Sequence, residues 1–106
     1  MSGSRTITRD DERLDNVHPG EILREDFQVG AEISVDEVAH ETGIEADRLE
    51  RILKGELSVD ANTDLRLARY FGMTEGFFLG LQNDFDLEEE RRTHGAEFER
   101  IVRRAA

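Results

Sequence analysis

The sequence predicts a single, small all-α domain of five or six short helices. Its 106 residues fall within the usual size of one domain, about 50 to 200 residues. No stretch alternates apolar and polar residues over the length of a strand, and β-branched residues are scattered singly. Apolar residues instead recur three and four positions apart, between residues that typically start and stop helices.

The first helix is predicted to run roughly from residue 19 to residue 28. Pro19 suits a first helical turn, where its missing N–H has no partner to lose, and the acid that follows complements the helix dipole. Leu23 and Phe27 lie four residues apart and therefore share one face. His18 precedes this helix, and we expect it to help cap the helix.

A second helix is predicted to begin at Ser34, which forms a capping box with Glu37, each side chain satisfying a free backbone N–H of the other residue. Gly43 then supplies the positive φ of a tight turn, and Ile44 is apolar. The third helix places its apolar residues on one face and is stopped by a glycine. These residues are Leu49, Ile52, Leu53 and Gly55.

Two helices joined by so short a turn are typical of the helix-turn-helix, whose second helix lies in the major groove of DNA. A small residue at the helix crossing, a turn glycine and three core contacts match this motif: Ala39, Gly43, Ile44, Leu49 and Ile52. From these residues alone an ordinary αα-hairpin remains the alternative. The expected DNA-binding residues are Ser34, Glu45, Ala46, Asp47, Arg48, Glu50, Arg51 and Lys54.

The outward face of the third helix carries three acids, although DNA is a polyanion. In one interpretation Asp47 pairs with Arg51 and Glu50 with Lys54, each i,i+4 pair contributing about 0.2–0.5 kcal/mol. In the other, an acid accepts a hydrogen bond from cytosine N4 while Arg51 contacts guanine, at about 1–3 kcal/mol per contact.

Two further helices follow. Asp60 is a start signal for a fourth helix, in which Leu65 and Ala68, and Leu67 and Phe71, share faces before Gly72 ends it. Thr74 is the expected N-cap of a fifth helix that should reach the acidic run near Glu90. Its apolar stripe exceeds what one face of a small domain needs, so we assign part of it to a homodimer interface: Phe77, Phe78, Leu81 and Phe85. Phe98, Ile101 and Val102 indicate a sixth helix, with His94 in a loop before it.

We expect three segments along the chain. Residues 1–16 contain few large apolar groups, cannot offset the entropy lost on ordering, and are predicted to be a flexible tail. Residues 17–92 are predicted to form the helix-turn-helix domain, and residues 93–106 a C-terminal helical extension.

The net charge of −11 opposes nonspecific binding to nucleic acid, which depends on Lys and Arg displacing counterions. The charge is uneven, however: residues 17–44 carry −6, whereas residues 45–71, with the third helix, carry only −1. The run of charges at residues 86–92 is typical of a solvated helix face.

The composition also excludes several kinds of protein. The chain has no cysteine, so it has no disulfide framework or thiolate site, which suits a reducing compartment. No segment resembles a signal peptide or a membrane span, and we expect a cytoplasmic protein. Its three histidines lack the spacing of a zinc pair, and no phosphate-binding loop or nucleophile motif is present. We expect no enzymatic activity, no metal and no cofactor.

Four segments resemble the HigA family of antitoxins, within the Cro and C1 repressor-like helix-turn-helix proteins. They are HPGEILREDF from residue 18, ISVDEVAHETGI from residue 33, ANTDLRLARYFG from residue 61 and FFLGLQNDFDLEEER from residue 77. The resemblance covers about residues 17–91. It implies a homodimer that binds operator DNA, represses its own operon and neutralises a basic HigB-type toxin, an mRNA endonuclease of the RelE kind. Charge complementarity between this acidic chain and such a toxin would speed their encounter.

The sequence departs from the family pattern at two places. Val35 stands where family members commonly have a Gln that contacts the DNA backbone, and Gly55-Glu56-Leu57 stands where many have a basic segment. Two phosphate contacts are thereby lost. Each lost contact lowers the slope of log affinity against log salt concentration by about 0.9. Two alternatives therefore remain: a protein-binding module with little DNA affinity, and a solitary transcriptional regulator without a toxin.

Overall fold

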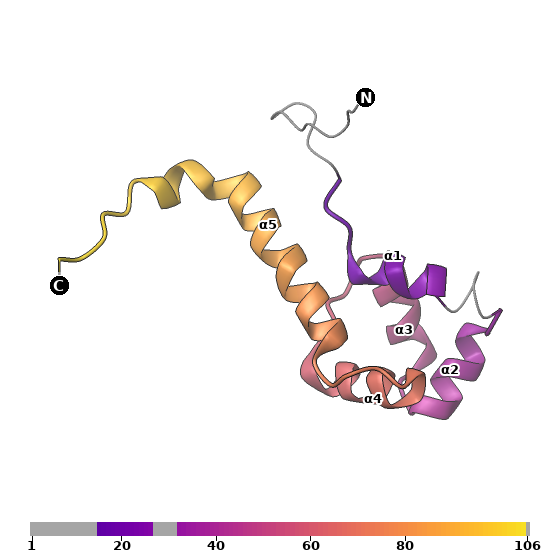
Figure 1. Ribbon diagram of the computed structural model, residues 1–106. Helices are drawn as coiled ribbons and strands as arrows, with labels where there is room; N and C mark the ends of the chain where they lie inside the picture. The colour runs from indigo at the N-terminus through magenta and orange to yellow at the C-terminus, as the bar shows by residue number, and fades with distance from the viewer. Residues whose placement is uncertain (1–14, 27–31, 106) are drawn as a thin grey trace, which may run out of the picture.

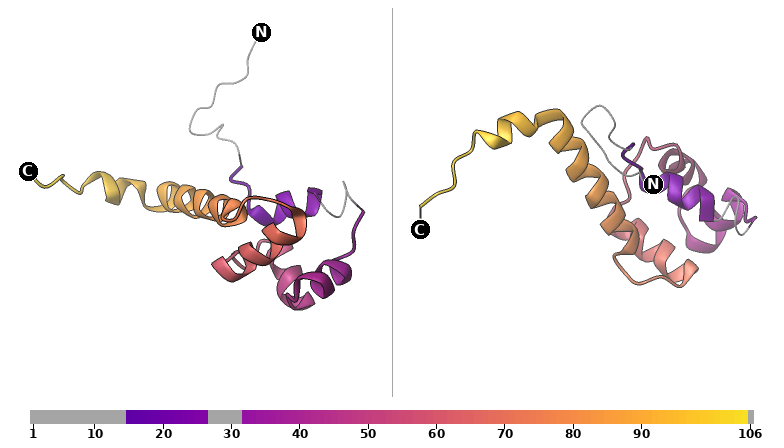
Figure 2. Two further views of the ribbon diagram at one scale, coloured as in Figure 1. Left: turned by 60° about the horizontal axis from the view of Figure 1, so that its bottom comes forward. Right: turned by 45° about the horizontal axis from the view of Figure 1, so that its top comes forward.

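The computed structural model describes residues 15–26 and 32–105, and in these ranges the chain forms five α-helices and no strand (Figure 1). The helices are α1 (Pro19–Leu23), α2 (Val35–Thr42), α3 (Ala46–Leu53), α4 (Ala61–Phe71) and α5 (Phe77–Glu99). The first four helices gather on one side of the molecule, and α5 leaves them so that its distal half projects away (Figures 1 and 2). The predicted all-α fold is confirmed.

A single core joins the short helices to the start of α5. Each of α1 to α4 contributes apolar side chains to it, and burial of one such side chain stabilises the fold by about 1.5–3 kcal/mol. The core residues are Leu23, Val35, Val38, Ile44, Leu49, Ile52, Leu53, Val59, Leu67 and Phe78. The predicted apolar face of α3 is confirmed, whereas Leu65 of α4 is 47% exposed.

Three predicted start signals cap their helices. The Nδ1 atom of His18 accepts a hydrogen bond from the Gly20 N–H at 2.9 Å. Ser34 Oγ accepts one from the Glu37 N–H at 3.1 Å, and Asp60 Oδ1 accepts one from the Thr63 N–H at 2.9 Å. Among the described residues, the return bond from the Ser34 N–H to the Glu37 carboxylate is not formed, so only half of the capping box is present.

Two glycines are required by the local geometry. Gly43 ends α2 with a φ of 79°, in the left-handed region where a side chain is strained. Gly20 lies so close to α3 that a Cβ atom would overlap the carbonyl oxygen of Ile52. This close approach seats α1 directly on the C-terminal end of α3, the predicted reading helix.

The helix boundaries differ from the prediction at several positions. α1 ends at Leu23, residues 24–26 continue as a π turn, and residues 27–28 of the predicted helix lie outside the described ranges. Gly76, with a φ of 92°, is the N-cap of α5 in place of Thr74. α5 continues past Glu90 to Glu99, so His94 and Phe98 are helical rather than in a loop and a separate helix. Residues 101–105 are not helical.

Asp64 explains why α5 begins at Phe77. This α4 side chain is 1% exposed, and its carboxylate accepts hydrogen bonds from the backbone N–H groups of Gly76 at 2.6 Å and Leu79 at 2.9 Å. A carboxylate at this position satisfies unpaired donors and complements the positive end of the helix dipole. The N-terminus of α5 is therefore capped by another helix.

Candidate nucleic-acid interface

The turn between α2 and α3 is held by its own residues. The Thr42 hydroxyl donates to the Val38 carbonyl at 2.7 Å and accepts from the Ile44 N–H at 3.2 Å. Ile44 is 5% exposed and anchors the turn in the core. Thr42 is buried and was not singled out by sequence reasoning, because its role depends on where the turn brings its hydroxyl.

Arg66 of α4 supports the same turn from behind. Its Nη1 donates to the Thr42 carbonyl at 2.9 Å, and its Nε donates to Asn62 Oδ1 at 2.9 Å. A cation at the C-terminal end of α2 complements the helix dipole. The angle between α2 and α3 is thus fixed by Ile44 on one side and by the Arg66 guanidinium on the other.

The residues predicted to bind DNA lie in three settings. Glu45, Asp47, Glu50, Arg51 and Lys54 are exposed along α3 and its ends. Ser34 is exposed at the start of α2, but its hydroxyl is engaged as the N-cap. Ala46 and Arg48 are half-buried.

Arg48 is held against α4. Its Nη2 lies 3.0 Å from Asp60 Oδ2 and 3.5 Å from Thr63 Oγ1. The backbone N–H and the hydroxyl of Thr63, together with Arg48, hold the pKa of Asp60 below its ordinary value. Asp60 therefore caps α4 and orients Arg48 with the same carboxylate.

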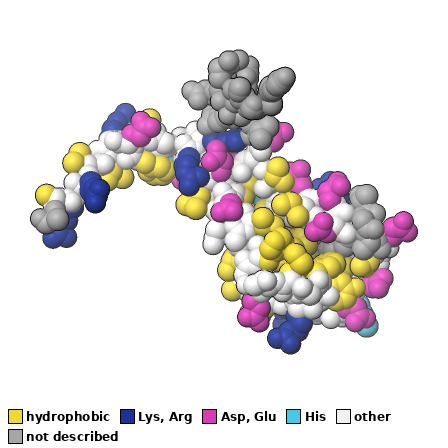
Figure 3. All heavy atoms as spheres, in the orientation of Figure 1, with side chains coloured by type: hydrophobic (Ala, Val, Ile, Leu, Met, Phe, Trp, Pro, Cys, Tyr) yellow, Lys and Arg dark blue, Asp and Glu magenta, His cyan; other side chains and the backbone are white. Residues whose placement is uncertain are grey.

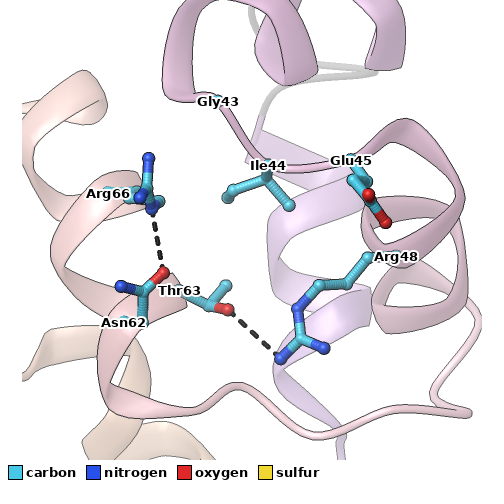
Figure 4. Close-up of a pocket in the computed structure, with 7 residues that line it drawn as sticks. All are labelled: Gly43, Ile44, Glu45, Arg48, Asn62, Thr63 and Arg66. Carbon is cyan, nitrogen blue, oxygen red and sulfur yellow. Dashed lines mark hydrogen bonds between the residues drawn. The ribbon is translucent and has the colours of Figure 1, made fainter.

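A small pocket of about 160 Å³ separates the turn from α4 (Figure 4). Arg48 and Arg66 enter it from opposite sides, and Glu45 lies on its rim (Figure 4). The remaining lining residues are Gly43, Ile44, Asn62 and Thr63. Both guanidinium groups already bond to protein oxygens. The pocket is therefore a polar gap between the turn and α4 whose two cations are already engaged.

The two ion pairs along α3 that one of the two interpretations of its acids requires, Asp47 with Arg51 and Glu50 with Lys54, are not formed among the described residues. Within residues 15–26 and 32–105, neither Arg51 nor Lys54 has an ion pair or a side-chain hydrogen bond, and the same is true of Asp47 and Glu50. A pair worth a few tenths of a kcal/mol does not hold two long, exposed side chains in one geometry. In the described part of the chain, Arg51 and Lys54 are therefore available to a partner, and no neighbouring cation neutralises Asp47 or Glu50.

The residues predicted to form the dimer interface divide into two groups. Phe78 is 2% exposed and belongs to the core. Leu81 is partly buried against the core, and the Phe85 ring lies 5.0 Å from the His18 ring in an edge-on contact. Phe77 is 38% exposed, so it is the member of this set that offers the most free surface.

Two other features bear on the type of site. No helix in the described ranges has the length and apolar character needed to cross a membrane. Groups of three or more potential metal ligands are likewise missing from residues 15–26 and 32–105.

A helix pair joined by a tight turn that the buried Thr42 and Ile44 anchor, with exposed polar side chains along one face of the second helix, defines this chain as a helix-turn-helix protein. No family model matches the sequence. A curated relative, virulence-associated protein I of Dichelobacter nodosus, is 35% identical over 72 residues, covering 68% of this chain and 67% of the relative.

Two solved structures are also similar. An addiction module antidote protein of the HigA family from Coxiella burnetii is 35% identical, with a TM-score of 0.80 over 87% of this chain and all of that chain. Antitoxin GraA in complex with its operator is 35% identical, with a TM-score of 0.79 over 88% of this chain and 94% of that chain. The chain belongs to the HigA family of helix-turn-helix antitoxins.

Proposed function

We propose that the protein is the antitoxin of a toxin–antitoxin pair and, as a homodimer in the cytoplasm, binds operator DNA to repress its own operon. The observation that carries the DNA-binding part is the exposed face of α3, where Arg51 and Lys54 have no partner in the described chain. The operator complex of the similar antitoxin GraA supports the same role.

In the proposed complex α3 enters the major groove. Arg51, in the middle of its exposed face, contacts a guanine, and Lys54, at its C-terminal end, contacts a phosphate. Asp47 or Glu50 accepts a hydrogen bond from a cytosine amino group. This contact adds specificity, because on an incorrect DNA sequence the acid forms no such bond and is repelled by nearby phosphates. Arg48 keeps its bond to Asp60 and orients α3 from behind.

The acids make binding weak for one protomer. Few phosphate-neutralising cations lie near α3, so little affinity comes from counterion release. Two copies on a palindrome, with half-site centres about 34 Å apart, compensate for this weakness. We therefore expect selective binding by the dimer and little affinity for random DNA.

The acidic surface supports a basic toxin of the HigB/RelE type as the protein partner. On the face drawn in Figure 3, acidic side chains surround an apolar area of the helical domain, whereas basic side chains gather along the projecting end of α5. An apolar centre with an acidic rim suits a basic protein surface, because the charges steer the encounter and the centre excludes water.

The test is binding of the purified chain to DNA from upstream of its own gene, titrated over salt beside a scrambled duplex. We expect specific binding that Arg51→Ala abolishes and Arg69→Ala leaves intact. Arg69 is the matched control, because it is exposed on α4 and loses the same charge. Equal, weak binding of both duplexes at low salt would refute the repressor.

A second candidate is a toxin-binding module that has kept the helix-turn-helix scaffold without DNA affinity. The observation that favours this candidate is that no neighbouring Lys or Arg side chain neutralises Asp47 or Glu50 in the described chain. A solitary regulator differs from both candidates in having no toxin. Co-expression with the product of a short, basic open reading frame beside this gene distinguishes the solitary regulator from both candidates, since a chain that neutralises the toxin restores growth and a solitary regulator does not.

A further inference from the structure

Each helix of the helix-turn-helix ends with a carbonyl that accepts a hydrogen bond from an arginine outside the helix pair. For α2, Nη1 of Arg66 on α4 donates to the Thr42 carbonyl at 2.9 Å. For α3, Nη2 of Arg24, the C-cap residue of α1, donates to the Leu53 carbonyl at 2.8 Å. The last carbonyls of a helix have no partner within it, and a cation there complements the helix dipole. We call these two contacts the arginine braces.

The basic residues in the last turns of α2 and α3 do not make these contacts. They are His40 and Arg51. Within the described chain, the His40 ring lies 3.4 Å from Glu41 Oε2, and Arg51 makes no side-chain hydrogen bond. A cap from its own last turn would stabilise a helix and leave its orientation free, whereas a brace from another helix also restrains the orientation. Both brace arginines are exposed, so their bonds add little to stability.

The Arg66 brace crosses the pocket between the turn and α4 (Figure 4). Because this pocket of about 160 Å³ lies there, packed apolar side chains do not fill that part of the boundary, and the guanidinium spans it. The bond from Arg66 Nε to Asn62 Oδ1, at 2.9 Å, orients the plane of the guanidinium. A Cβ atom on Gly43 would lie only 2.8 Å from Arg66 Nη1. The turn glycine therefore leaves room for this side chain in addition to supplying the positive φ.

The Arg24 brace acts where α1 already lies against the end of α3. Gly20 approaches the Ile52 carbonyl closely, and Arg24 binds the next carbonyl, that of Leu53. Backbone N–H groups of residues 54–56 bond to the three carbonyls before Leu53, so Arg24 supplies the donor that the backbone does not. Lys54, the proposed phosphate contact, follows directly. The brace therefore restrains the backbone beside a residue expected to touch DNA.

We propose that Arg24 and Arg66 are positioning residues for operator recognition. They hold α3 and α2 at the tilt at which the exposed face of α3 meets base edges, and they do not contact DNA themselves. The inference rests on the operator binding proposed above. Asp47 and Glu50 make this tilt important, because a carboxylate that misses its cytosine lies among phosphates that repel it. Loss of a brace should therefore lower selectivity while changing stability little.

The first test measures binding of Arg24→Gln and Arg66→Gln to the own-promoter duplex and to a scrambled duplex over a range of salt, at a temperature where each variant is folded. Affinity for the own-promoter duplex should fall about fivefold or more, as for the loss of one base contact. The weak affinity for the scrambled duplex, the urea midpoint and the salt slope should stay near those of the wild type. Arg69→Gln is the matched control, because Arg69 is exposed on α4 and loses the same charge.

The salt slope distinguishes positioning from a phosphate contact. An arginine that neutralises a phosphate would lower the slope by about 0.9 when it is replaced, and this result would overturn the inference. Lysine variants separate geometry from charge. Arg24→Lys should restore much of the selectivity, since one nitrogen makes that brace, whereas Arg66→Lys should restore little, since lysine lacks the planar fork that reaches Thr42 and Asn62 together. Full recovery by both lysines would show that charge alone matters and would also overturn it.

A measurement without DNA tests the braces independently of the repressor. The natural chain has no cysteine, so spin labels can be placed at Glu50→Cys on α3 and Leu65→Cys on α4, with an excess of unlabelled chain to isolate distances within one chain. The distance distribution should broaden in each glutamine variant. An unchanged distribution would refute the positioning role. A broadened distribution in a chain whose wild type binds no operator would support the braces and refute only the repressor.

Discussion

The side-chain oxygen of Gln82 accepts a hydrogen bond from the backbone N–H of Val59 at 2.9 Å and thereby joins α5 to the loop that precedes α4. Gln82 is 2% exposed, and its Nε2 donates to Asp86 Oδ1 at 3.0 Å. Val59 lies beside Asp60, the partner of Arg48 on α3. A series of contacts through Val59 and Asp60 therefore connects α5 to α3, the helix proposed to contact the operator.

Replacing Gln82 by Leu should lower the free energy of unfolding by about 1–3 kcal/mol, because the buried Val59 N–H loses its acceptor. Urea denaturation measures the change. Asn83→Leu is the control, since Asn83 is the exposed neighbour. Equal effects of the two substitutions would show that the bond to Val59 contributes nothing.

Asp64→Asn should destabilise the chain by about 2 kcal/mol, because charge-assisted hydrogen bonds contribute about 1.5–3 kcal/mol. The substituted amide keeps one acceptor for two N–H donors and loses the charge that complements the α5 dipole. Thermal unfolding of this variant beside Glu75→Gln, at an exposed position, separates the cap from a general charge effect. An unchanged melting temperature would contradict the capping role.

Stability should decrease as the solution is acidified through the range where histidine titrates. Burial lowers the pKa of His18 below its ordinary value of 6.5, an effect that Asp86 and Glu21 oppose. The folded state therefore favours the neutral ring, whose Nδ1 accepts the Gly20 N–H. The contribution is complete above pH 6.5 and is lost as pH falls through the lowered pKa, because the unfolded chain binds the proton first.

The free energy of unfolding, followed between about pH 7.5 and pH 5.5, measures this loss. His18→Asn keeps a capping oxygen without a titrating ring and should flatten the profile. His40→Asn, at a side chain that is 86% exposed, should retain the slope of the wild type. A steep profile in the His18 variant would assign the effect to another group.

Asp60→Ala should cost about 1 kcal/mol, since it removes the N-cap of α4. Arg48→Ala should cost less, because the two side chains of this ion pair are 35% and 59% exposed. A double-mutant cycle should give a coupling free energy of about 0.2–1 kcal/mol, the range of solvated pairs. A coupling free energy of zero would show that Asp60 does not hold Arg48, and its guanidinium would then be available for a direct DNA contact.

Much of the fold could be predicted because the signals are local. Ser34, Asp60 and Gly43 act on backbone groups within four residues of themselves, so their spacing in the sequence determines their role. The apolar face of α3 was predictable for the same reason, since Leu49, Ile52 and Leu53 follow the helical period.

The remaining features depend on contacts between distant residues. Asp64 caps α5 across twelve residues, and nothing in its neighbourhood distinguishes it from the exposed acids. Arg48 was predicted to face DNA, but Asp60, also twelve residues away, binds it. Phe78 was assigned to an interface because periodicity does not say which side of a stripe meets the core.

The distal end of α5 has a consequence for the lifetime of the protein. Beyond Arg92, the described chain makes no hydrogen bond or ion pair with another helix, and a short helix without packing is marginal in water. Arg100 is the C-cap of α5, and Arg103 and Arg104 lie in the non-helical residues after it, so the bonds that follow these arginines are accessible to proteases whether or not the helix opens. Cleavage is therefore expected first at this end of the chain, before proteases reach the packed helices α1 to α4.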